Sequence, residues 1–151
     1  VSVGEKDLLQ QALERQRFRK IFWKAAIKPG KPLLFGMLGN RPYFGLPGNP
    51  GATAATFELF AKPAMKRLAG QADVLPEKRR ARLTHNVTGD GKRLALLWCR
   101  LEWDGNSYQV TASKGQSSGQ NQCLADANAI LPVAAGVEQL ETGTDVEVLI
   151  I

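Results

Sequence analysis

The stretch that decides the fold is FWKAAIKPGKPLLFGMLGNRPYFGLPGNP, at residues 22–50. It carries Lys24, Lys28 and Lys31 around two Pro-Gly turns. It ends in the tight turn Pro47-Gly48-Asn49-Pro50, and a helical pattern follows at once. Lysines near a helix N-terminus suit an anion such as phosphate or another oxyanion. The stretch therefore predicts an anion site beside a turn that leads into a helix.

Outward from this stretch, the first part of the chain alternates helix and strand signals. Apolar spacing predicts a helix over residues 7–16. A hairpin-like turn is expected at 39–42, and a longer helix over 51–69, kinked or split at Pro63 and stopped by Gly70. Three strands complete this part, over residues 21–27, 32–38 and 43–46. An α/β unit with so few strands and helices is incomplete. This incompleteness predicts further sequence before Val1 or completion by another chain.

The second half changes to short strands. A polar stretch at 70–78 predicts a linker. Strands without long helices between them indicate a small barrel or sandwich. We therefore expect an α/β domain over residues 1–72 and an all-β domain over 73–151. The strands are expected over residues 80–88, 93–103, 107–113, 129–134 and 145–151.

Composition limits the function. Of 151 residues, 44% are hydrophobic and 23% are charged, which is typical of a globular protein. We see no apolar run long enough for a membrane span and no signal peptide, so we expect a cytoplasmic protein without a membrane partner. The net charge of +6 includes the cluster Lys78-Arg79-Arg80-Ala81-Arg82. No aromatic side chains interleave with this cluster as a stacking surface needs, so a solvated basic face is favoured over nucleic-acid binding.

Cysteine and histidine give no strong signal. Cys99 and Cys123 are far apart in sequence, and with the single His85 they make a poor metal set. Buried free thiols in a reducing compartment are the favoured interpretation. His85 is expected to be structural, and no serine–histidine nucleophile can be assembled.

Three segments together make the chain resemble the C-terminal part of the MoeA family. They are VSVGEKD at 1–7, FWKAAIKPGKP at 22–32 and GLPGNP at 45–50. The family comprises the molybdopterin molybdenumtransferases, and the gephyrin E domain belongs to it. The likeness fades in the second half, where residues 127–130 (ANAI) resemble an Ala-Asn-Gly segment. The resemblance implies part of a MogA-like, three-layer molybdopterin-binding α/β domain followed by a C-terminal β-barrel, together about the last third of a typical member.

The resemblance also implies a reaction. Family members insert molybdate into the dithiolene of adenylylated molybdopterin and release AMP, helped by a divalent cation such as Mg2+. Their active cleft lies between the α/β domain of one protomer and the C-terminal domain of the other, so we expect a homodimer. A MogA-like adenylyltransferase is the implied partner. The present chain alone is expected to be inactive, and a non-catalytic binding or scaffold module of the same fold is the alternative.

Motif matches assign the expected site residues. Asp7 matches an acidic position that implies a metal ligand, against the alternative of a residue favoured by a helix N-terminus. Lys24 and Lys28, four apart on a strand, would share one face and converge on one anion, where they would favour charge on the leaving AMP; otherwise they are solvated lysines. The turn at 47–50 would present backbone N–H groups to the ligand, against the alternative of a plain strand-to-helix connector. The implied catalytic residues are Asp7, Lys24 and Lys28, and the implied ligand-binding residues are Gly4, Lys31, Pro47, Gly48, Asn49, Pro50, Arg93 and Ser118.

Two departures from the family pattern bear on this assignment. After the turn, the family usually has a larger residue and then Ser, whereas this chain has Gly51 and Ala52; Thr53 offers a nearby hydroxyl. Near Ser118, Ser117 replaces a glycine of the family's loop. For Arg93 and Ser118, a role in the site and the alternative of a surface arginine and a plain loop serine therefore have equal weight.

Overall fold

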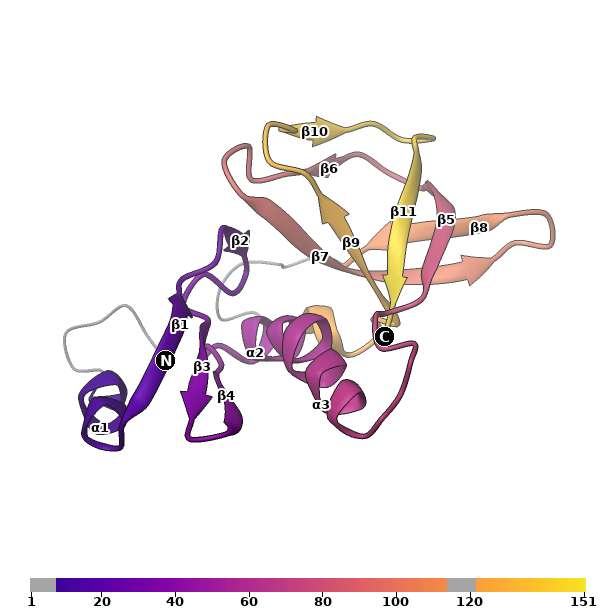
Figure 1. Cartoon of the computed structure of the whole chain (residues 1–151). Coiled ribbons are helices and arrows are strands. Elements are labelled where there is room, and N and C mark those ends of the chain that lie inside the picture. Colours follow the sequence, from indigo (N-terminus) through magenta and orange to yellow (C-terminus); the bar gives the residue numbers. More distant parts are fainter. Residues whose placement is uncertain (1–7, 114–121) are drawn as a thin grey trace.

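The computed structural model describes residues 8–113 and 122–151, and its first half forms helices around a small sheet (Figure 1). Its elements are α1 (Leu9–Arg15), β1 (Phe18–Trp23), β2 (Ile27–Lys28), β3 (Leu34–Leu38), β4 (Arg41–Gly45), α2 (Pro50–Thr56), the π-helical turn η1 (Phe57–Ala61) and α3 (Lys62–Leu68). Strands β1, β3 and β4 form an antiparallel sheet in which β3 is central. A row of three aromatic rings, from Phe22, Phe35 and Phe44, crosses this sheet at directly paired positions.

The strand expected over 21–27 is a wrong prediction. Strand β1 ends at Trp23, and Lys24 adopts a φ of 75°, which lies outside the range of an extended strand. Ile27 and Lys28 then form β2, which leaves the small sheet altogether. The hairpin expected at 39–42 is present but tighter, because β4 begins at Arg41.

Pro63 shapes the long helix without ending it. A proline removes one helical donor and crowds the preceding turn. Here α2 passes into η1, where the Lys62 N–H bonds to the Phe57 carbonyl, and α3 starts directly afterwards. The expected kink or split is thus realised as one wide turn that precedes the proline.

The second half closes into a β-barrel (Figure 1). Its elements are β5 (Lys78–Leu83), β6 (Val87–Thr88), β7 (Leu94–Trp103), β8 (Tyr108–Ala112), η2 (Gln122–Leu124), β9 (Ala129–Val133), β10 (Gln139–Leu140) and β11 (Asp145–Ile150). The strand order is β7-β8-β5-β11-β9, and pairing of β9 with β7 completes the ring. The strand expected over 80–88 is instead two strands, because β6 turns away and pairs with β10. The expected α/β unit followed by a small barrel is confirmed.

Strand β7 joins the two halves because it is buried on both faces. Ala95, Cys99 and Leu101 point into the barrel core. Leu96 and Trp98 belong to a second core with Ile27 and Ala55, which come from β2 and α2. The helices are therefore packed on the outside of the barrel by a continuous apolar layer. In the part of the chain that the structure describes, no helix has the length and apolar character needed to cross a membrane.

Candidate functional site

A carboxylate joins two of the expected site residues. Lys28 Nζ lies 2.9 Å from Asp90 Oδ1. Arg93 binds the same carboxylate at two points, with Nε 2.8 Å from Oδ2 and Nη2 3.1 Å from Oδ1. Lys28 lies within the motif at 22–32, and Arg93 directly precedes β7, the barrel's longest strand. The structure therefore brings together one predicted cation from each half of the chain.

Backbone pairing explains this meeting. Strand β2 runs parallel to the start of β7, with Ile27 opposite Leu94 and Lys28 opposite Ala95. The Leu94 N–H also donates to the Ala26 carbonyl at 3.1 Å. Lys28 lies within this short strand pairing and Arg93 directly precedes it. The paired backbones therefore fix the positions from which both side chains extend.

The turn that carries Asp90 is also fixed. The Gly89 N–H donates to the Glu138 carbonyl, and the Gly136 N–H donates to the Gly91 carbonyl, both at 2.8 Å. A Cβ on Gly89 would lie 2.2 Å from the Val137 carbonyl oxygen, so only glycine permits this approach. Asp90 therefore projects from a turn that is tied to the neighbouring loop on both sides.

The electrostatics of the trio favour full ionisation. Hydrogen bonds from Arg93 and then from Lys28 hold the pKa of Asp90 well below its usual range. The same bond raises the pKa of Arg93. Two cations share one anion, so the group keeps a net positive charge at neutral pH. Such a group is suited to an incoming phosphate or oxyanion.

Lys24 and Lys31 are placed differently from Lys28. The Lys24 ammonium lies over the Trp23 ring, 4.1 Å from its centre. Backbone bonds pair this region with the next turn, from Lys24 N–H to the Leu33 carbonyl and from Ala25 N–H to the Lys31 carbonyl, each 2.9 Å. The expectation that Lys24 and Lys28 share one face of a strand is wrong, because β1 ends at Trp23, before Lys24, and Lys28 belongs to the separate strand β2. Both Lys24 and Lys31 remain exposed.

The turn at 47–50 is held by its own side chains. The Asn49 side chain caps α2 by accepting from the Ala52 N–H at 3.2 Å, and Pro50 occupies the first turn of the helix. The Thr53 hydroxyl lies against the carbonyls of Pro47 and Asn49. The hydroxyl that we expected to replace the family's serine is therefore engaged with the turn itself.

Three expected site residues, Gly4, Asp7 and Ser118, lie outside the described residues. Within residues 8–113 and 122–151, no three His, Cys, Asp or Glu side chains gather in a way that could hold a metal ion. Asp90 is already bonded to two cations, so the described residues offer Mg2+ no ligand set, and Asp7, the expected metal ligand, lies outside them. Cys99 and Cys123 are buried thiols, as expected, and burial raises the pKa of both, that of Cys99 to about 12.

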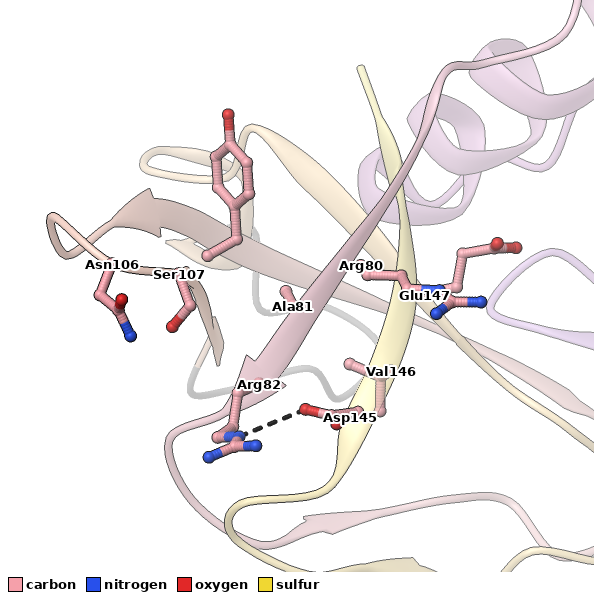
Figure 2. A pocket seen from close by; sticks show the side chains of 9 residues that line it. Arg80, Ala81, Arg82, Asn106, Ser107, Asp145, Val146 and Glu147 are labelled. Atoms are coloured by element: carbon pink, nitrogen blue, oxygen red, sulfur yellow. Dashed lines mark hydrogen bonds and ion pairs between the residues drawn. The ribbon is translucent and has the colours of Figure 1, made fainter.

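A groove on the outside of the barrel lies apart from these residues (Figure 2). Strands β5 and β11 and the start of β8 line it, and none of the described site residues does. Within the basic cluster, Lys78 pairs with Glu147 at 2.7 Å and Arg82 with Asp145 at 3.2 Å. Arg79 contacts Glu77 as well. Carboxylates thus offset much of the charge expected on this face.

Sequence reasoning missed Asp90. The segment TGDGK at 88–92 lies between the strands expected over 80–88 and 93–103, and its local pattern indicates only a turn. The signal was an acidic residue set between two glycines directly before an expected site arginine. The role of Asp90 depends on the long-range pairing of β2 with β7, which no local sequence pattern predicts.

Comparison with known proteins agrees with this architecture. Residues 1–67 match the family described as a probable molybdopterin binding domain, and residues 80–151 match the MoeA C-terminal region (domain IV). The chain is 33% identical over 154 residues to a molybdopterin molybdenumtransferase of Nostoc sp. and 28% identical over 150 residues to one of Staphylococcus aureus. A solved structure of the molybdopterin biosynthesis MoeA protein from Pyrococcus horikosii superimposes with a TM-score of 0.80 at 30% identity.

These matches define an α/β unit of the probable molybdopterin binding domain family joined to a MoeA-type C-terminal barrel. The chain belongs to the MoeA family. The matches cover 99% of this chain for both relatives and 95% for the solved structure. The chain spans about a third of the length of these proteins: 35% and 36% of the relatives and 34% of the structure.

Proposed function

We propose that this chain acts in molybdenum cofactor biosynthesis, as part of a molybdopterin molybdenumtransferase. The reaction would insert molybdate into adenylylated molybdopterin and release AMP. Support comes from the family membership and from the names of the relatives. The observation that carries the proposal is the shared carboxylate of Asp90, which gathers Lys28 and Arg93 into one positive group.

In this proposal Lys28 and Arg93 bind an anionic group of the substrate. Molybdate and the phosphates of adenylylated molybdopterin are all oxyanions. A guanidinium offers a planar fork of donors, and an ammonium offers a compact charge. Both would favour negative charge that develops on the departing AMP. Lys24 and Lys31 are exposed on the adjoining turn and would strengthen the local positive potential.

The turn at 47–50 is proposed to face the same ligand through its backbone. Asn49 caps the helix, so its contribution to binding would be to fix the turn rather than to reach the ligand with its side chain. Gly4, Asp7 and Ser118 keep the roles implied by their motifs. When bound, Mg2+ would neutralise phosphate charge, and Asp7 is the residue proposed to hold it.

Organisation and partners follow the same family pattern. We divide the chain into an α/β unit over 1–72 and a barrel domain over 73–151. The working protein is proposed to be a cytoplasmic homodimer that receives its substrate from a MogA-like adenylyltransferase. The two buried cysteines, which form no disulfide, are compatible with a reducing compartment. The cleft between protomers stays a prediction, to which Lys28 and Arg93 would contribute together from one chain.

The test is AMP release from adenylylated molybdopterin by the protein as its gene encodes it, with and without molybdate. Lys28→Ala should lower molybdate-dependent turnover by at least about tenfold, or about 1.4 kcal/mol. Lys78→Ala is the matched control, because Lys78 is also an exposed lysine paired with a carboxylate, and it lies on the barrel away from this site. Unchanged turnover in Lys28→Ala would overturn the assigned role. Tight substrate binding without AMP release would favour a scaffold module of the same fold.

A further inference from the structure

Of the trio Lys28, Asp90 and Arg93, the carboxylate is the most shielded from solvent and the two cations are more exposed. The Asp90 side chain is 9% exposed, whereas that of Lys28 is 58% exposed and that of Arg93 is 33% exposed. In the part of the chain that the structure describes, Asp90 is the bonded partner of both cations. Arg93 uses Nε and Nη2 for this bond, and Lys28 uses one direction of its ammonium group. Further N–H donors remain on each cation for a ligand.

We propose that Asp90 is a positioning residue of the anion site, which holds the Lys28 ammonium and the Arg93 guanidinium side by side so that both can donate to one anionic group. The inference rests on the proposed function and adds a residue that none of the sequence motifs assigns. Asp90 acts through the two cations and is not proposed to contact the substrate.

Charge alone would separate the two cations. Lys28 and Arg93 touch the same oxygen of Asp90, so their charges lie close together and repel one another without it. Lysine also has a long, flexible stem that must be ordered before it can bind a ligand in one place. A carboxylate on a turn tied down by backbone bonds removes both difficulties. The bidentate bond further fixes the plane of the guanidinium.

A different role would give the opposite result. If Asp90 only neutralised the cations, it would compete with the incoming anion, and its removal would tighten anion binding. If Asp90 positions them, its removal weakens binding although the site becomes more positive. The sign of the change therefore separates the two roles.

The experiment uses the protein as its gene encodes it, with inorganic molybdate as the probe. Asp90→Asn should raise the KM for molybdate in AMP release by about tenfold, comparable to the loss of one hydrogen bond to a charged group. Calorimetric titration with molybdate should show the same loss of affinity. Asp145→Asn is the matched control, since it also removes an aspartate bonded to an arginine, and its KM should stay at the wild-type value. A KM for Asp90→Asn equal to or below the wild-type value would overturn the proposal.

A double variant tests whether Asp90 acts through Lys28. In a Lys28→Ala background, Asp90→Asn should raise the KM for molybdate by less than in the wild type. Equal effects in both backgrounds would overturn the proposal. If Asp90→Asn does not fold, Asp90→Glu replaces it, because it keeps the charge but displaces the carboxylate. A wild-type KM for Asp90→Glu would then contradict a positioning role.

The outcomes also separate this inference from the function on which it rests. If Lys28→Ala and Arg93→Ala both leave the KM and turnover unchanged, the proposed function fails. If both variants impair the reaction and Asp90→Asn does not, only the positioning role of Asp90 fails.

Discussion

Gly30 packs directly against Thr56, which joins the turn after Lys28 to the helix that follows the motif turn at 47–50. A Cβ on Gly30 would lie 2.7 Å from Thr56 Cγ2 and 2.9 Å from Ile27 Cδ1, and the φ of Gly30 is +119°. Thr56 is fully buried, and its hydroxyl donates to the Ala52 carbonyl at 2.7 Å. Two segments that carry expected site residues are thus held together by one close contact.

Gly30→Ala should therefore destabilise the protein. The new methyl group would meet a buried side chain in a backbone conformation that alanine rarely adopts. We expect a loss of about 3 kcal/mol in the free energy of unfolding, from overpacking and backbone strain together. Urea denaturation measures it. Gly105→Ala is the matched control, because Gly105 has a similar φ of +100° and open space around it. An equal loss in both variants would show that the contact with Thr56 contributes nothing.

Asn49 should matter for helix stability through its side-chain oxygen. Asn49→Ala removes the acceptor that bonds the Ala52 N–H and should cost about 1 kcal/mol. Asn49→Ser keeps an acceptor at the cap and should retain most of the stability. Thermal denaturation of the two variants decides between them. Equal stability of Asn49→Ala and the wild type would mean that the cap is not a stabilising contact.

The core between helix and barrel should be separable from the barrel core. Leu96 and Leu131 are each 1% exposed, but Leu96 faces α2 and Leu131 faces the barrel interior. Each change to alanine should cost about 3 kcal/mol. Hydrogen exchange should differ, because Leu96→Ala should speed exchange in α2 and β2 while the barrel strands stay protected. Identical exchange patterns in the two variants would indicate that both cores open as one unit.

The ion pairs of Asp90 should leave a signature at acid pH. Because the folded pKa of Asp90 lies below its ordinary value of 3.8, the carboxylate contributes stability that is fully present above pH 3.8. That contribution is lost as the pH falls from 3.8 through the folded pKa. The difference in unfolding free energy between wild type and Asp90→Asn should therefore be constant near neutral pH and shrink below 3.8. A difference that grows on acidification would contradict the direction of the shift.

Local patterns predicted the strands that form the barrel ring, the hairpin of the small sheet and the proline-modified helix, but not the short strand β10. Each depends on residues close in sequence: alternation of apolar side chains, turn residues, and the missing N–H of Pro63. The break after Trp23 was not predictable, because a lysine at positive φ has no local signature. It is fixed by backbone bonds from Lys24 N–H to the Leu33 carbonyl and from Ala25 N–H to the Lys31 carbonyl. The split between β5 and β6 likewise depends on β10, which is distant in the chain.

The sequence by itself determined the family, the order of the two structural units and most of the expected cations. Only the tertiary structure decided that β2 joins β7, that Lys28 and Arg93 meet on Asp90, and that Lys24 lies over Trp23 instead of beside Lys28. The reason is physical. Periodicity and turn chemistry act over a few residues, whereas the partner of a charged side chain is chosen by strand pairing and packing between segments far apart in the chain.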